Sequence, residues 1–178
     1  LEIAKTITAD IVVGDPMNMT SDLGPLVSEV QYQKVQNLIN TGVNEGAQLV
    51  IGGTGKPDGL SKGFYVKPTV FGHVNNEMTI AREEIFGPVL SIISYNSLEE
   101  AIFIANDTDY GLAAYVTGKD TDKALQLARG LRAGQVSINY GSSGPAAPFG
   151  GFKQSGNGRE KAEWGLGEFL EVKAIMGK

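Results

Sequence analysis

The amino-acid sequence predicts an α/β fold built around a parallel sheet. Three β-rich stretches, Val89–Tyr95, Leu112–Thr117 and Gln135–Asn139, alternate with two amphipathic helical segments. Strands that alternate with helices at this spacing are typical of right-handed crossovers, which join neighbouring parallel strands. A glycine-rich stretch follows the third strand, at the place where open α/β sheets bind ligands.

Length, composition and charge indicate a globular chain and exclude several classes of protein. The 178 residues are 42% hydrophobic and 20% charged, which is enough to bury a core and rules out a disordered chain. The net charge of −5 argues against a nucleic-acid partner. No apolar run approaches the roughly 18 residues of a membrane span, and no signal peptide is visible. We therefore expect a cytoplasmic protein with no membrane partner.

The first strong element is a helix that begins at Ser28. Ser28 and Gln31 have the spacing of a capping box, in which each side chain satisfies an amide of the first turn. A short buried strand is expected at Ala47–Ile51. The stretch Phe64–Phe71 is also rich in strand formers, but Pro68 lies inside it and favours an edge strand.

Three further helix starts and a terminal strand are predicted in the second half of the chain. Ser97 and Glu100 form another capping box, and Asp120 is an N-cap candidate for the following helix. Asn157 is expected to cap a short helix. In the tail Glu168–Met176, apolar and polar residues alternate weakly. The tail is therefore expected to form an edge strand that needs a partner.

Several apparent motifs fail on inspection. The segment Gly53–Lys56 lacks the first glycine and the hydroxyl residue of a phosphate loop, and Gly156–Gly158 lacks the third glycine of a dinucleotide fingerprint. Gly141–Gly144 does not have the spacing of a nucleophile elbow. His73 is the only histidine and the chain has no cysteine, so we expect no metal site, disulfide or thiolate nucleophile within it.

The most unusual stretch is Arg82–Val89, with the sequence REEIFGPV. One interpretation is a solvated acidic turn with Phe86 in the core. The other is a ligand site, in which a carboxylate accepts hydrogen bonds from sugar hydroxyls and an aromatic face lies against a planar heterocycle. The residues of this stretch alone leave both open.

The strings EEIFGPVLSI, NDTDYGLAAYV and PFGGFKQSGNGRE, in this order, resemble the aldehyde dehydrogenase superfamily, and the resemblance covers essentially the whole chain. It implies that residues 1–156 are the carboxyl-terminal part of a parallel-sheet catalytic domain. Residues 157–178 would supply a terminal helix and a β-strand arm for homo-oligomerisation. The resemblance also implies that Glu84 bonds the nicotinamide ribose of NAD or NADP, and that Phe86 contacts the nicotinamide region.

In this family the loop after the third strand lines the aldehyde entrance. By resemblance, four residues of that loop are candidates for a small-aldehyde pocket: Tyr140, Ser142, Ser143 and Phe149. Two of these are aromatic and two are serines. The resemblance therefore implies a partly aromatic, slightly polar tunnel.

The absence of cysteine separates this chain from the chemistry of the family. There a cysteine thiolate attacks the aldehyde, hydride leaves to the nicotinamide, and water hydrolyses the resulting thioester. In the family that cysteine and the dinucleotide-binding domain lie earlier in the sequence. Because this chain opens at Leu1, we expect a fragment of an NAD(P)-dependent enzyme that oxidises aldehydes to carboxylic acids, inactive alone. The alternative is a stand-alone, non-enzymatic interaction module.

Overall fold

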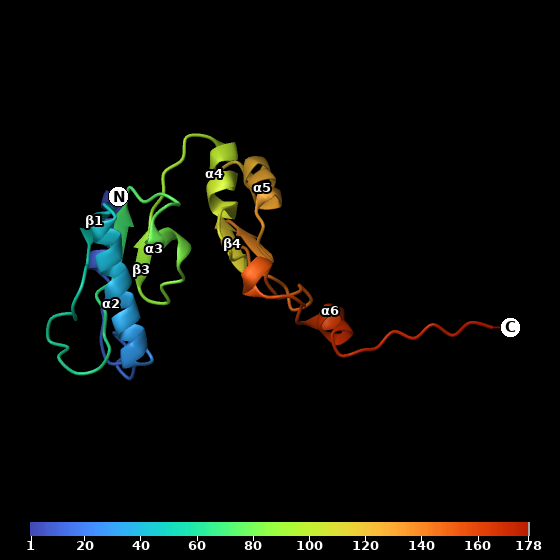
Figure 1. The fold of residues 1–178 in the computed structure, drawn as a ribbon, viewed down its shortest axis with the longest axis horizontal. Helices are drawn as coiled ribbons and strands as arrows, with labels where there is room; N and C mark the ends of the chain where they lie inside the picture. The colour runs from blue at the N-terminus through green and yellow to red at the C-terminus, as the bar shows by residue number, and fades with distance from the viewer. Residues whose placement is uncertain (178) are drawn as a thin grey trace. The chain divides into compact units, whose positions relative to one another are not determined.

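The computed structural model describes residues 1–177, which form two compact units. The first comprises Leu1–Ser94 and the second begins at Tyr95. Figure 1 shows helices and strands in both units, which confirms the predicted α/β class. None of the helices within residues 1–177 is long and apolar enough to cross a membrane.

The first unit contains a three-stranded sheet with helix α2 packed against it (Figure 1). In the sheet order β1-β2-β3, the first pair is antiparallel and the second pair is parallel. The elements in chain order are α1 (Glu2–Ala9), α2 (Glu29–Asn44), β1 (Gln48–Ile51), β2 (Thr69–Gly72), α3 (Thr79–Arg82) and β3 (Val89–Ser91).

The core of this unit lies between α2, the sheet and α3. Val35 and Ile39 of α2 and Phe71 of β2 have no exposed surface, and Ile80 of α3 and Ile85 join the same cluster. Apolar side chains spaced at three to four residues along α2 therefore face the sheet, as its helical periodicity predicts.

Strand β2 is the central strand of this sheet, so the predicted edge strand at Phe64–Phe71 is wrong. All four residues of β2 are buried. Pro68 lies immediately before the strand, where its missing N–H removes no bond from either ladder. The N–H of Thr69, the first strand residue, donates to the carbonyl of Pro88 at 2.9 Å.

The second unit contains a parallel pair of strands and two longer helices. Strands β4 (Ala113–Val116) and β5 (Gln135–Ile138) pair in parallel across helix α5 (Thr121–Gly130). Helix α4 (Leu98–Asn106) contacts α5. The parallel crossover from β4 to β5 is confirmed, but β3 pairs with β2 in the other sheet, so the three predicted strands do not share one sheet.

Three of the predicted helix caps are present. The hydroxyl of Ser28 accepts the N–H of Gln31 at 3.2 Å, and that of Ser97 accepts the N–H of Glu100 at 3.1 Å. The carboxylate of Asp120 accepts the N–H of Lys123 at 3.1 Å. Each of these caps satisfies an amide that has no partner inside its helix.

The end of the chain differs from its prediction. After a 3₁₀ turn at Lys153–Ser155, the last helix, α6, spans Ala162–Gly167, and Asn157 does not cap it. The strand expected at Glu168–Met176 is not formed within the described residues. A strand is defined by ladder hydrogen bonds to a neighbour, and a weakly alternating tail has no sheet of its own on which to form them.

Candidate functional site

The segment Glu84–Gly87 after α3, here called the acidic–aromatic turn, directs one side chain into the core and two toward solvent. Ile85 is 8% exposed and belongs to the core, whereas Glu84 is exposed and Phe86 is 69% exposed. The interpretation that buries Phe86 in the core is therefore wrong. The turn presents a carboxylate and an aromatic ring at the surface of the first unit, two residues apart.

Helix α2 holds this turn through its backbone carbonyls. The side-chain amide of Gln31 donates to the carbonyl oxygens of Ile85 at 2.9 Å and Phe86 at 3.1 Å. The ammonium of Lys34 donates to the carbonyl oxygen of Glu84 at 2.7 Å. Three consecutive carbonyls are thus bound by two side chains one turn apart on the helix. Nothing near Gln31 or Lys34 in the sequence indicates this role, because the bound carbonyls lie about 50 residues away.

The turn also lies very close to the helix. A Cβ atom at Gly87 would lie 2.7 Å from a methyl carbon of Val35, so only glycine fits there without displacing the core. Phe86 has a φ of 58°, in the left-handed region that side chains rarely adopt. A strained backbone at an exposed aromatic residue is a feature that clusters at functional sites.

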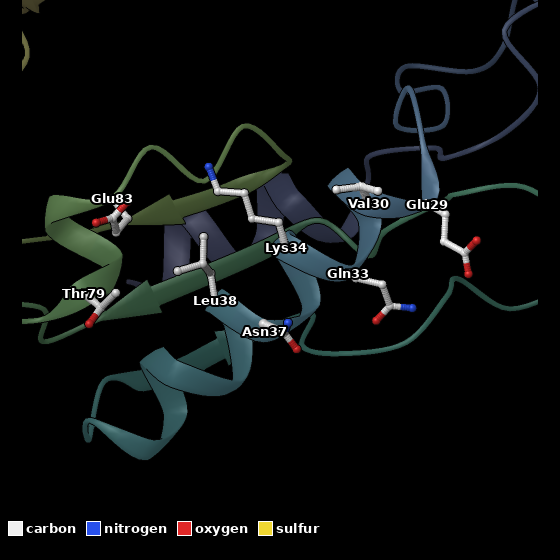
Figure 2. A pocket seen from close by; sticks show the side chains of 8 residues that line it. All are labelled: Glu29, Val30, Gln33, Lys34, Asn37, Leu38, Thr79 and Glu83. Atoms are coloured by element: carbon white, nitrogen blue, oxygen red, sulfur yellow. The ribbon is translucent and has the colours of Figure 1, made fainter. Parts of the chain in front are cut away.

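An open groove of about 780 Å³ runs along the outer face of α2 toward α3. Figure 2 shows Lys34 and Leu38 of α2 between the two ends of the groove, with Thr79 and Glu83 at the α3 end. Its remaining lining residues are Glu29, Val30, Gln33 and Asn37. Because Lys34 both lines the groove and binds the carbonyl of Glu84, the groove borders the acidic–aromatic turn.

The four residues predicted to form an aldehyde pocket are divided among the described hollows of the second unit. Ser142 and Ser143 line a hollow of about 400 Å³ beside β5. Phe149 lines a different one of about 350 Å³, formed with the segment around Arg159 and Phe169. Tyr140 is 89% exposed and lines neither of these.

Two of the quoted motifs contact each other within the second unit. The ammonium of Lys153 donates to the carbonyls of Asn106 and Thr108, each at 2.7 Å. In addition, the N–H of Gly111 donates to the hydroxyl of Ser155 at 2.9 Å. The stretches NDTDYG and GGFKQSG are therefore tied together by side chains that bind backbone.

The basic residues of the glycine-rich region are part of this framework. Lys153 is exposed and Arg159 is half-buried, so both lie at the surface, as their place in the glycine-rich region favours. Arg159 donates to the carbonyls of Gly151 at 2.9 Å and Gly158 at 2.6 Å, and its guanidinium lies 5.3 Å from the ring centre of Phe152. A guanidinium offers five donors in a fixed plane, which suits the bridging of several carbonyls.

No group of three or more histidine, cysteine, aspartate or glutamate side chains that could hold a metal ion occurs within residues 1–177. The candidate residues for cofactor and substrate fall into two sets, one in each unit. Glu84 and Phe86 lie together on one turn of the first unit, and the four loop residues lie in the second.

Comparison with known proteins identifies the family to which this α/β chain belongs. Residues 1–175 match the model of the Aldehyde dehydrogenase family. A curated protein of Staphylococcus aureus (strain USA300), whose name also places it among the aldehyde dehydrogenases, is 54% identical over 169 residues. That match covers 95% of this chain and 36% of the relative. The chain therefore belongs to the aldehyde dehydrogenase family.

Solved structures of the same class are also similar. A mutant of aldehyde dehydrogenase C from Pseudomonas syringae, complexed with NAD+ and octanal, is 53% identical with a TM-score of 0.94. The match covers 98% of this chain and 36% of that one. An aldehyde dehydrogenase from Bartonella henselae is 46% identical with a TM-score of 0.95, over 98% of this chain and 37% of that chain. The chain thus spans about 36% of the length of the relatives that it matches.

Proposed function

We propose that this chain supplies the nicotinamide-binding turn and the aldehyde-entrance loop of an NAD(P)-dependent aldehyde dehydrogenase. The observation that carries the proposal is the outward projection of Glu84 and Phe86 from a turn that α2 binds by three hydrogen bonds. Membership of the family supports it, and so do the relatives from Pseudomonas syringae and Mycobacterium tuberculosis, whose structures are complexes with NAD+.

The chemistry of the two projecting side chains fits a nicotinamide nucleoside. A carboxylate accepts two hydrogen bonds from adjacent ribose hydroxyls, and charge on the acceptor strengthens them. An exposed aromatic ring offers a flat apolar surface to a planar heterocycle. Such a cofactor, when bound, supplies a hydride acceptor. In our proposal Glu84 fixes the ribose and Phe86 limits the positions open to the ring beside it.

In this proposal the loop after β5 lines the aldehyde entrance. Tyr140 and Phe149 would give the aldehyde entrance an aromatic lining, and Ser142 and Ser143 would add hydroxyl groups. Octanal in the Pseudomonas syringae complex is one aldehyde bound by a relative. This supports an aldehyde as the substrate class, and the loop side chains would take part in selecting its size and polarity.

The nucleophile must come from elsewhere in the enzyme. The chain has no cysteine, so we propose that the attacking thiolate belongs to a part of the catalytic domain outside these 178 residues. Residues 1–156 would then complete that domain, and residues 157–178 would contribute a helix and a strand to an oligomer. We expect the 178-residue chain alone to show no aldehyde-dependent reduction of NAD+ and no saturable binding of it.

The test uses the complete gene product as its source cell makes it, assayed for NAD+ reduction in the presence of aldehydes. In the Glu84→Gln variant the ribose hydroxyls lose a charged acceptor, so we expect the KM for NAD+ to rise about ten-fold. Glu83→Gln removes the neighbouring exposed carboxylate and is the matched control, with no expected change. Equal effects of the two substitutions would remove the ribose assignment, and an inactive wild type would remove the proposed function.

A further inference from the structure

We propose that Gln31 is a positioning residue that sets the direction of Phe86 and, through it, the geometry of the cofactor turn. This inference rests on the function proposed above. Gln31 occupies the third position of α2, where its N–H is capped by Ser28 at 3.2 Å. In a capping box its side chain would return to the N–H of Ser28. It instead donates to the carbonyls of Ile85 and Phe86, more than 50 residues away in sequence.

The two acceptors of Gln31 flank the strained residue. The carbonyl of Ile85 belongs to the peptide group before Phe86, and the carbonyl of Phe86 belongs to the group after it. Fixing both peptide groups fixes the two backbone angles between them, and φ of Phe86 is held at 58°. A left-handed aromatic residue persists only where its surroundings over-determine the backbone. Gln31 supplies that constraint through the nitrogen of its side-chain amide, which donates to both carbonyls.

The neighbouring residues leave the backbone of the turn little freedom. Ile85 is anchored in the core, Lys34 binds the carbonyl of Glu84 at 2.7 Å, and Gly87 lies against Val35. The backbone from Glu84 to Gly87 is therefore attached to one face of α2. The groups that project from it are the Glu84 carboxylate and the Phe86 ring, which are the two proposed to meet the cofactor.

The test compares Gln31→Met and Gln31→Glu with the control Gln33→Met in the complete gene product. Methionine keeps the length of the side chain but donates no hydrogen bond, and glutamate places two acceptors against two carbonyls. Gln33 lies on the same helix, is exposed, and has no described bond to the turn. We expect KM for NAD+ to rise about ten-fold in Gln31→Met and further in Gln31→Glu, with kcat changed less than two-fold and Gln33→Met unchanged.

A second readout separates positioning from general stability. Amide hydrogen exchange across residues 83–89 should quicken in both Gln31 variants, while exchange in β1 and β2 stays as in the wild type. A lowered melting temperature with unchanged KM and unchanged local exchange would overturn the inference. An inactive wild type would remove the proposed function alone, because local exchange still reports whether Gln31 holds the turn. If the full-length variants do not fold, amide exchange across residues 83–89 is measured in the 178-residue chain instead. Unchanged exchange there in Gln31→Met would overturn the inference.

Discussion

Both polar atoms of the Asn139 side-chain amide form hydrogen bonds with the backbone of Gly118. Its oxygen accepts the N–H of Gly118 at 2.9 Å, and its amide donates to the carbonyl of the same residue at 3.0 Å. The two residues follow closely after the parallel strands β5 and β4. One side chain thus joins the carboxyl ends of both strands, immediately before the loop that carries Tyr140.

Substituting Asn139 should loosen this junction by two separable effects. Asn139→Gly removes both hydrogen bonds and should lower the free energy of unfolding by about 1–2 kcal/mol. Asn139→Ala removes the same bonds and also places alanine at a φ of 48°, which should cost about 1 kcal/mol more. Denaturant unfolding measures both changes, and the exposed Asn157→Ala serves as a control with an expected change within about 0.5 kcal/mol. If alanine equals glycine, the left-handed backbone contributes nothing.

Gln36 of α2 carries a buried amide whose hydrogens have no described partner. The residue is 8% exposed, its oxygen accepts the N–H of Gly55 at 2.5 Å, and its nitrogen has no hydrogen-bond acceptor. A buried donor left unsatisfied costs about 1–3 kcal/mol, whereas a typical hydrogen bond contributes about 1 kcal/mol.

We therefore expect Gln36→Met to leave stability unchanged or to raise it by about 1 kcal/mol. Methionine fits the same unbranched space, and Gly55 is near enough to the surface for water to reach its N–H. Chemical denaturation measures the effect, and Gln33→Met on the exposed face of the helix gives the baseline. A clear loss of stability in Gln36→Met would mean that the bond to Gly55 outweighs the unsatisfied donor.

Three of the four predicted helix caps, at Ser28, Ser97 and Asp120, are confirmed, because a cap is an interaction between near neighbours. Ser97 and Asp120 each accept the N–H three residues later, as their spacing indicates. The parallel pairing of β4 with β5 also follows from local pattern, since a strand, a helix and a strand leave few topologies.

Features that depend on distant residues could not be read from the sequence. Strand β2 is central because β1 and β3 lie on either side of it, which nothing near Pro68 indicates. The left-handed backbone of Phe86 lies beside the amide of Gln31, although the spacing of Gln31 from Ser28 predicts a local capping bond instead. In the loop after β5, glycines leave the path of the chain open, so the sequence does not fix which hollow each candidate lines.

The pKa of Asp120 lies below its usual value of 3.8, mainly because its carboxylate accepts the backbone N–H of Lys123. Desolvation opposes this change, and the Lys123 ammonium, 3.7 Å away, adds to it. The folded state therefore favours the ionised carboxylate. The resulting stability is complete above the unfolded pKa of about 3.8 and is lost as the pH falls through the folded value.

This linkage predicts a pH-dependent advantage of aspartate over asparagine at position 120. Asparagine caps helices as a neutral acceptor, so Asp120→Asn should melt slightly below the wild type near pH 6, by a small margin because the carboxylate is exposed to solvent. The difference should close as the pH falls through the folded pKa of Asp120, which lies below 3.8, because the wild-type carboxylate is then protonated. Asp120→Ala lacks any cap and should be the least stable at neutral pH. Melting curves measured across this range check the prediction, and a constant gap between wild type and Asp120→Asn would contradict it.

The tail beyond α6 exposes a set of large apolar side chains along an extended backbone. Phe169, Val172, Ile175 and Met176 are almost fully exposed, and the tail has no ladder within the described residues. Exposed apolar surface with unpaired backbone groups favours strand addition to a sheet edge of another chain. We therefore expect the 178-residue chain to self-associate through this tail.

Sedimentation velocity over a range of concentrations measures that association. The double variant Val172→Ser with Ile175→Ser keeps the tail but removes two of its apolar contacts, and it should shift the chain toward monomer. Val27→Ser with Val30→Ser removes two equally exposed valines near the start of α2 and should leave association unchanged. If both double variants reduce association equally, the chain associates through exposed apolar surface in general. A larger effect of the tail variant is expected only if the tail itself forms the contact.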